Sequence, residues 1–262
     1  MNRDLVRDVS ANMRSAICRF ADHAPTGEST TFGGLTAVSS GLPSPMFNRV
    51  FVFETPDAET LSTAMAWMAE QAVPYLVTAP DTVRTDLERI APDVGLTRTP
   101  DIHPGMALAS LDALTPGEAA TDPPTDGTPV TIEHVTDEDG IAAFAQVMAE
   151  SFELPLEFTR VATPPSMLDD DHLTPLLGRC DGDAVACGLL VRNDDIAGVY
   201  SIGVTDANRR RGVGHAMTTA VLEAGRDAGC AVGTLQSSPL GHSLYERMGF
   251  ETVVDYHQFQ PV

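Results

Sequence analysis

The sequence predicts an α/β protein made of two similarly patterned parts. Segments with helical periodicity alternate with short strand-like runs both in residues 1–112 and in residues 130–262. Between them, residues 113–129 contain four prolines and almost no large apolar side chain. We interpret 113–129 as a linker or long surface loop that separates an N-terminal domain, 1–112, from a C-terminal domain, 130–262.

The elements of the C-terminal part follow from periodicity and turn residues. An Asp-Gly turn at 181–182 and an Asn-Asp-Asp turn at 193–195 separate three strands, and Gly229 is a plausible helix C-cap. The predicted helices are 137–152, a short one within 155–168, 212–228 and 239–248. The predicted strands are 130–135, 176–180, 184–192, 196–204, 230–236, 250–255 and 257–260.

The N-terminal part has a similar pattern but carries no glycine-rich loop of the kind that binds phosphate. Its predicted helices are 5–22, 58–71 and 82–90, and its predicted strands are 30–38, 48–54, 74–78 and 106–111. We therefore hypothesise that the two parts are diverged copies of one fold.

The charge of the chain limits its partners. The 262 residues include 37 acidic and 16 basic side chains, for a net charge of -21. All 16 basic side chains are arginine, and the chain contains no lysine. Such a chain repels nucleic acid and anionic membranes, so we expect neither as a partner. The acidity favours a salt-adapted protein from a halophilic cell. The high salt of such a cytoplasm would screen the repulsion between the acidic side chains. The alternative is an acidic cytosolic protein from a GC-rich genome.

Several kinds of chemistry are excluded or disfavoured by composition. Without lysine the chain forms neither a Walker A loop nor a Schiff base. The four cysteines form no CxxC pair or Cys/His cluster, so we expect buried free thiols and no metal site. The first residues lack the apolar core of a signal peptide, and no apolar run approaches about 20 residues. We therefore expect a cytoplasmic protein.

The most informative segment is Arg-Arg-Arg-Gly-Val-Gly at 209–214, between a predicted strand and a predicted helix. A helix N-terminus carries unpaired N–H groups and a partial positive charge, and glycines let a phosphate approach the backbone. A solvated basic patch is the alternative for so short a charge run. A dinucleotide-binding fingerprint fails, because Met217 replaces its third glycine and Gln236-Ser237 replace the acidic ribose contact.

Three elements together resemble the GNAT acetyltransferase superfamily. Its central motif, [Gln/Arg]-x-x-Gly-x-[Gly/Ala] after a strand, matches 209–214, and the preceding strand ends at 202–204. Its Leu-Tyr-x-x-x-Gly-Phe sequence matches 244–250. The resemblance covers residues 130–262 and extends to 1–112 only as a degenerate copy. It implies the GNAT fold, a mixed central sheet flanked by helices, here as two halves in tandem.

The resemblance also implies a site. It assigns acetyl-CoA as the co-substrate, with backbone N–H groups near 210–215 on its pyrophosphate and strand-like pairing of 202–204 with pantetheine. Ser238 stands where many members carry an asparagine that contacts the cofactor. The cofactor-binding residues predicted in this way are Ile202, Gly203, Val204, Arg209, Arg210, Arg211, Gly212, Val213, Gly214, His215 and Ser238.

The implied reaction is direct attack of an amine of a small molecule or peptide on the thioester carbonyl. The backbone near Val204 would polarise the carbonyl, and Tyr245 would protonate the departing thiolate. The residues do not identify the general base. The candidates are Glu153, Glu157, Asp194, Asp195, Tyr200 and His242.

Two alternatives to this N-acyltransferase remain at this stage. One is a non-catalytic acyl-CoA sensor or partner-binding module, and the other is a GNAT-like fold that uses a different acyl donor, such as an aminoacyl-tRNA. The acidic charge argues against tRNA. The acceptor and the length of the acyl group are not specified by the sequence, and we expect that the chain can form a homodimer.

Overall fold

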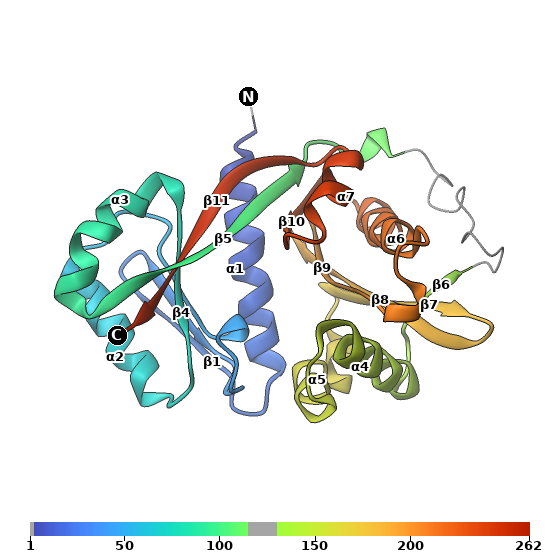
Figure 1. Cartoon of the computed structure of the whole chain (residues 1–262), viewed down its shortest axis with the longest axis horizontal. Coiled ribbons are helices and arrows are strands. Elements are labelled where there is room, and N and C mark those ends of the chain that lie inside the picture. The colour runs from blue at the N-terminus through green and yellow to red at the C-terminus, as the bar shows by residue number, and fades with distance from the viewer. Residues whose placement is uncertain (1–2, 115–129) are drawn as a thin grey trace. The chain divides into compact units, whose positions relative to one another are not determined.

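The computed structural model describes residues 3–114 and 130–262, which form two compact units (Figure 1). Unit 1 comprises 1–106, 236–241 and 252–262, and unit 2 comprises 107–235 and 242–251. Unit 1 therefore includes two segments from the C-terminal end of the chain. Most of the predicted linker, residues 115–129, lies outside the described residues.

Unit 1 is a sheet flanked by helices on both faces. Its helices are α1 (Leu5–His23), α2 (Ala58–Glu70) and α3 (Asp81–Ile90). Its strands are β1 (Glu28–Phe32), β2 (Leu35–Ser39), β3 (Arg49–Phe51), β4 (Leu76–Pro80), β5 (Leu96–Leu108) and β11 (Glu251–Pro261). They lie in the order β1-β2-β3-β4-β11-β5. Pairing is antiparallel from β1 to β3, parallel between β3 and β4, and antiparallel between β4 and β11.

Strand alternation divides the core of unit 1 between the two faces of its sheet. On one face α2 and α3 pack on a buried cluster that includes Val50, Val77, Ala79 and Phe259. On the other face α1 packs against β1 and β2, and Ser10 Oγ lies 2.7 Å from the hydroxyl of Tyr256. Figure 1 shows this three-layer arrangement within the unit.

The strands of unit 2 are also flanked by helices on both faces. Its helices are α4 (Glu138–Phe152), α5 (Leu156–Ala162), α6 (Val213–Asp227) and α7 (His242–Arg247). Its strands β6 (Thr131–His134), β7 (Leu173–Cys180), β8 (Asp183–Asn193), β9 (Ile196–Val204) and β10 (Val232–Gln236) lie in the order β10-β9-β8-β7-β6. The pairs from β6 to β9 are antiparallel, and β9 and β10 are parallel.

Two glycines let helices approach the sheet of unit 2 closely. A Cβ on Gly188 would lie 2.8 Å from Met217 of α6, and one on Gly203 would lie 2.9 Å from Ser151 of α4. Gly188 and Gly203 lie on opposite faces, because Gly203 pairs with Cys187. The absence of side chains at both positions therefore brings α6 against β8 and α4 against β9, the strand that ends at the predicted residues 202–204.

The α/β class and the mixed sheet flanked by helices are confirmed. Most predicted elements are present within one to three residues of their expected bounds, including both hairpin turns, where Asp181 and Asp194 adopt positive φ. Three expectations were wrong. Residues 30–38 form two strands, because Gly33 and Gly34 make a hairpin turn. The strand expected at 106–111 is the end of a longer one, β5, and the two expected final strands are one, β11, which continues through Tyr256.

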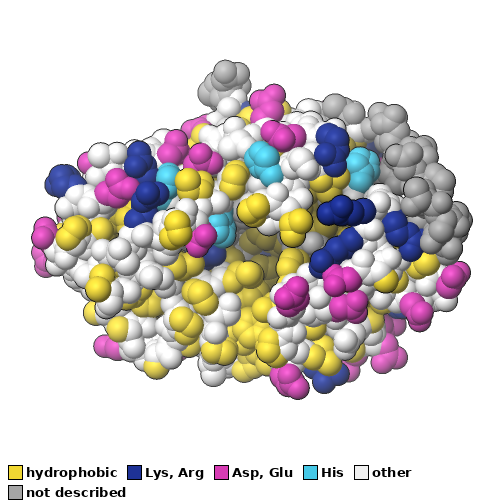
Figure 2. Space-filling model, in the orientation of Figure 1, with side chains coloured by type: hydrophobic (Ala, Val, Ile, Leu, Met, Phe, Trp, Pro, Cys, Tyr) yellow, Lys and Arg dark blue, Asp and Glu magenta, His cyan; other side chains and the backbone are white. Residues whose placement is uncertain are grey.

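Figure 2 shows acidic side chains distributed over the visible face, with basic side chains among them. No helix in the described ranges 3–114 and 130–262 is long and apolar enough to cross a membrane.

Candidate functional site

The end of β9 extends beyond its parallel neighbour. The ladder between β9 and β10 stops at the pair Gly198–Thr234, whereas β9 continues to Val204. On its other side β9 stays paired with β8 up to Val204. Ile202, Gly203 and Val204 therefore lie in a part of the strand where the β10 side is not filled by that ladder. An extended ligand could pair with the backbone there.

A β-bulge lies immediately before this strand end, and the sequence did not indicate it. Cys187 pairs with Gly203 and Leu189 with Tyr200, so two residues of β9 oppose the single residue Gly188. Ser201 adopts a φ of 51°, and its carbonyl accepts a hydrogen bond of 3.2 Å from Cys187 Sγ. Bulges re-aim neighbouring side chains and backbone groups, and this one sets the direction of 202–204.

The N-terminus of α6 is open to an anion. Its N-cap is Gly212, with φ 80°, no side chain caps the helix, and its first turn contains no acidic residue. Each other described helix of seven residues or more has an acidic residue in its first turn, and α1, α2 and α4 also have an aspartate cap. Since the first N–H groups of a helix lack partners within it, those of α6 are available to a ligand.

The three arginines before α6 have different roles. Arg209 is held by the protein, because it donates to the carbonyls of Val204 (3.1 Å) and Ser151 (2.9 Å) and lies 2.7 Å from an oxygen of Asp206. Arg211 donates to Asn208 Oδ1 at 3.2 Å. Arg210 is exposed, adopts a φ of 59°, and its side chain has no hydrogen bond or ion pair within the described ranges.

Gly212 and Gly214 differ in how strictly the fold requires glycine. Gly212 has a left-handed conformation that favours glycine. Gly214 has no such constraint, and a Cβ there would meet only Leu244 at 3.6 Å and Val204 at 3.8 Å, which is ordinary contact. The protein thus tolerates a side chain at 214, and the glycine keeps the helix backbone accessible. This arrangement fits a phosphate group at the N-terminus of α6, next to the buried Val213 and the half-buried His215.

Tyr245 is positioned by the end of α7. Gly249 has φ 89°, its N–H bonds to the carbonyl of Glu246, and the N–H of Phe250 bonds to the carbonyl of Tyr245. This is a Schellman motif, with its apolar contact made by the Tyr245 and Phe250 rings at 5.9 Å. The motif explains the spacing of Tyr, Gly and Phe in 245–250 from the geometry of a helix end alone.

The Tyr245 hydroxyl is available for chemistry. It has no hydrogen-bond partner among the residues that the structure describes. Burial raises the pKa of Tyr245 to about 12. The hydroxyl is therefore protonated throughout the physiological range and can act as a donor.

Ser238 lies in the segment 236–241 of unit 1, where its hydroxyl accepts a hydrogen bond of 3.2 Å from the N–H of Gly241. The other predicted site residues all belong to unit 2.

The base candidates are spread over unit 2. Asp194 and Asp195 form the turn before β9, roughly 26 Å from its other end at about 3.3 Å per residue, which is too far for action at 202–204. The remaining candidates lie elsewhere on the fold. Glu153 is the C-cap of α4, Glu157 lies in the first turn of α5, Tyr200 lies on β9, and His242 Nε2 lies 3.5 Å from Glu246 Oε1.

The cysteines are all free thiols. Cys187 and Cys230 are buried, and Cys18 and Cys180 are partly buried. Burial raises the pKa of Cys187 to about 12 and also raises the pKa of Cys18 and Cys230. These three thiols are therefore protonated and poor nucleophiles. In the described part of the chain, no group of three or more His, Cys, Asp or Glu side chains could hold a metal ion.

Comparisons with known proteins agree with this architecture. Residues 141–250 match the model of the acetyltransferase (GNAT) family. A search of curated proteins finds no match. A GCN5-related N-acetyltransferase from Kribbella flavida superposes with a TM-score of 0.70 at 15% identity, over 97% of this chain and 95% of that one.

Two further structures share the fold at low identity. A GCN5-related N-acetyltransferase from Sphaerobacter thermophilus has a TM-score of 0.60 at 17% identity, over 87% of this chain and 80% of that one. A tandem GNAT protein from the clavulanic acid biosynthesis pathway has a TM-score of 0.57 at 13% identity, over 86% and 73%. The chain therefore has the GNAT fold, and its residues 141–250 match the model of the GNAT acetyltransferase family.

Proposed function

We propose that this protein is an N-acyltransferase that transfers an acetyl group from acetyl-CoA to an amine of a small molecule or peptide. The observation that carries the proposal is the open N-terminus of α6 beside the unfilled end of β9, within a domain of the GNAT family. One feature suits a pyrophosphate and the other suits an extended amide chain. Coenzyme A contains both.

In this proposal the helix end holds the pyrophosphate. Backbone N–H groups within 210–215 donate to its oxygens, and the helix dipole adds a partial positive charge. Arg210 supplies the free guanidinium, whereas Arg209 fixes the loop by joining β9 to the end of α4. The extended part of the cofactor pairs with 202–204, and the backbone near Val204 polarises the thioester carbonyl.

The proposed role of Tyr245 follows from its pKa. An ordinary thiol has a pKa of about 8.5, so a thiolate is a weaker base than the tyrosinate of a residue with a pKa of about 12. The hydroxyl therefore donates a hydrogen bond to the sulfur as negative charge develops there. The proton that finally neutralises the thiolate comes from the attacking amine, which loses it when the new amide bond forms and the C–S bond breaks.

We also propose that residues 1–112 are a degenerate copy of the GNAT-like half, so that the chain has two such halves in tandem joined by 113–129. The support is a shared order of elements. In both halves three antiparallel strands are followed by a helix, a strand parallel to the third, a second helix and a last strand.

The function is tested by measuring thiol release from acetyl-CoA with a panel of amines, in parallel with mass spectrometry of the products. The expected result is amine-dependent release of free thiol and a product heavier by one acetyl group. Acetyl-CoA binding without turnover over a broad amine panel would favour the sensor instead. No binding, at either low or high salt, would contradict the proposal.

A further inference from the structure

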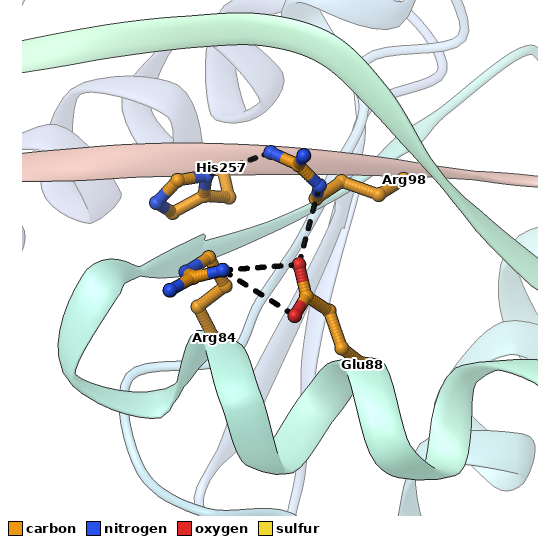
Figure 3. Close-up of polar contacts among 4 residues, drawn as sticks. All are labelled: Arg84, Glu88, Arg98 and His257. Atoms are coloured by element: carbon orange, nitrogen blue, oxygen red, sulfur yellow. Dashed lines mark hydrogen bonds and ion pairs between the residues drawn. The ribbon is translucent and has the colours of Figure 1, made fainter.

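Unit 1 contains an arginine whose charge the protein does not neutralise. Arg49, on β3, is partly buried, and no Asp or Glu forms an ion pair with it among the described residues. Two other arginines of the unit have a carboxylate partner. Arg84 and Arg98 share the carboxylate of Glu88 at 3.3 and 3.2 Å, beside His257 (Figure 3). In a chain with 37 acidic residues, a partly buried arginine whose hydrogen bonds all go to neutral groups is unexpected.

The hydrogen bonds of Arg49 leave part of its guanidinium unused. Nε donates to the carbonyl of Met46 at 3.3 Å, and Nη1 donates to Thr78 Oγ1 at 2.9 Å and Gln258 Oε1 at 2.6 Å. A guanidinium has five N–H donors, so these bonds use three of them, all on neutral acceptors. The two donors of Nη2 have no protein partner within the described ranges.

The neighbours hold this group rigidly and provide a further donor. Thr78 Oγ1 donates to Gln258 Oε1 at 2.8 Å, and Thr78 and Gln258 are direct partners on β4 and β11. Gln258 Oε1 accepts hydrogen bonds from both Thr78 and Arg49, which identifies this atom as the amide oxygen. The other terminal atom of Gln258 is therefore the amide nitrogen, which is a donor. That nitrogen also has no hydrogen-bond partner in the described part of the chain.

These groups project from the sheet face opposite α2 and α3. Val50, Val77 and Phe259, which alternate with them along the strands, lie in the core on the α2 and α3 side. His103, on β5, lies close enough to Arg49 for its charge to matter. Its pKa is lowered first by burial and then by Arg49, while Asp101 opposes the shift.

We propose that Arg49, together with the amide of Gln258, forms a binding site in unit 1 for a small carboxylate. A partly buried guanidinium whose hydrogen bonds all go to neutral acceptors lacks a counter-charge, and carboxylates bind such a group through short, charge-assisted hydrogen bonds. One guanidinium and one neutral amide match a single negative charge, whereas a phosphate dianion would remain partly unneutralised. The site is separate from the loop at α6 and does not depend on the function proposed for it.

The test measures the thermal stability of the full chain with acetate, succinate or inorganic phosphate, at constant ionic strength set with sodium chloride. Backbone amide NMR shifts of β3, β4 and β11 locate the binding. Two variants remove the site in different ways. Arg49→Met removes the charge, and Gln258→Glu gives Arg49 an internal carboxylate without deleting it. Arg89→Met is the matched control, because it removes one exposed arginine of unit 1 that pairs with Asp86.

The proposal predicts that carboxylates raise Tm and shift the amides of these strands in the wild type and in Arg89→Met. Both effects should be absent in Gln258→Glu and, where it folds, in Arg49→Met. Three results would overturn the proposal: no response of the wild type to any carboxylate, a response only to phosphate, or a full response in Gln258→Glu.

Discussion

In each half of the chain a helix follows three consecutive antiparallel strands, and these two helices, α2 and α6, begin differently. In the N-terminal half α2 is capped by Asp57, whose carboxylate accepts hydrogen bonds from the N–H of Thr60 at 2.8 Å and from its hydroxyl at 2.7 Å. Glu59 adds a second carboxylate to its first turn. In the C-terminal half α6 is capped by Gly212, with no side-chain hydrogen bond and no acidic residue in its first turn.

The difference shows how one position in a fold can be either closed or open to ligands. At α2 the protein supplies its own anion, which satisfies the helix end and complements its dipole. At α6 the same groups are left for a ligand, and Arg210 adds a free positive charge. The comparison predicts that the C-terminal half binds the cofactor and that the N-terminal half does not.

The largest effect is expected from Tyr245 on α7. The corresponding helix of the N-terminal half, α3, ends at Leu87–Ile90 and has no tyrosine there. Tyr245→Phe should reduce kcat by about 100-fold, the scale of losing one positioned hydrogen-bond donor to developing negative charge, with little change in the Kd for acetyl-CoA. Stability should hardly change, because the hydroxyl makes no hydrogen bond within the described residues. Steady-state kinetics and thermal unfolding check both points. A normal kcat in this variant would show that the hydroxyl takes no part.

The second-largest effect is expected from a substitution that makes the start of α6 resemble that of α2. Gly212→Asp places a carboxylate where the phosphate should bind and should weaken acetyl-CoA binding by about 100-fold through like-charge repulsion. Gly212→Asn is the matched control, since asparagine also tolerates the left-handed conformation but carries no charge. If the two variants bind acetyl-CoA equally well, the anion does not sit at this helix end.

The arginines before α6 sharpen the comparison further. Arg210→Met should weaken acetyl-CoA binding by about tenfold without loss of stability, because its exposed side chain makes no hydrogen bond or ion pair within the described ranges. Arg209→Met should instead lower Tm, because it breaks the bonds to Val204, Ser151 and Asp206. Acetyl-CoA titration and thermal unfolding of both variants separate the two roles. Weaker binding in Arg209→Met together with a lower Tm in Arg210→Met would contradict this assignment.

The smallest effect concerns the closed helix. Asp57→Ala should lower Tm modestly and leave acetyl-CoA affinity unchanged. Hydrogen bonds from Thr60 lower the pKa of Asp57, so its contribution is present above the pKa of the unfolded chain and is lost as pH falls through the folded value. The Tm difference between wild type and variant should therefore shrink in acid. A difference that grows in acid would contradict this role.

The sequence was sufficient for the features that depend on local pattern. The bounds of β9 and α6 follow from strand composition, helical period and flanking glycines, and the resemblance located Tyr245. Other features depend on contacts between distant residues. Nothing in the run of arginines distinguishes Arg209, which folds back onto Ser151, from the free Arg210. The bulge at Ser201 and the pairing of β11 with β4 are likewise set by tertiary packing rather than by periodicity.

The most direct measurement is the stoichiometry of acetyl-CoA binding by isothermal titration calorimetry at low and high salt. The account predicts one acetyl-CoA per chain, with binding strongly weakened in Gly212→Asp and unchanged in Asp57→Ala. Two sites per chain would contradict the assignment of the N-terminal half as closed. No binding in either salt condition would contradict the cofactor assignment itself.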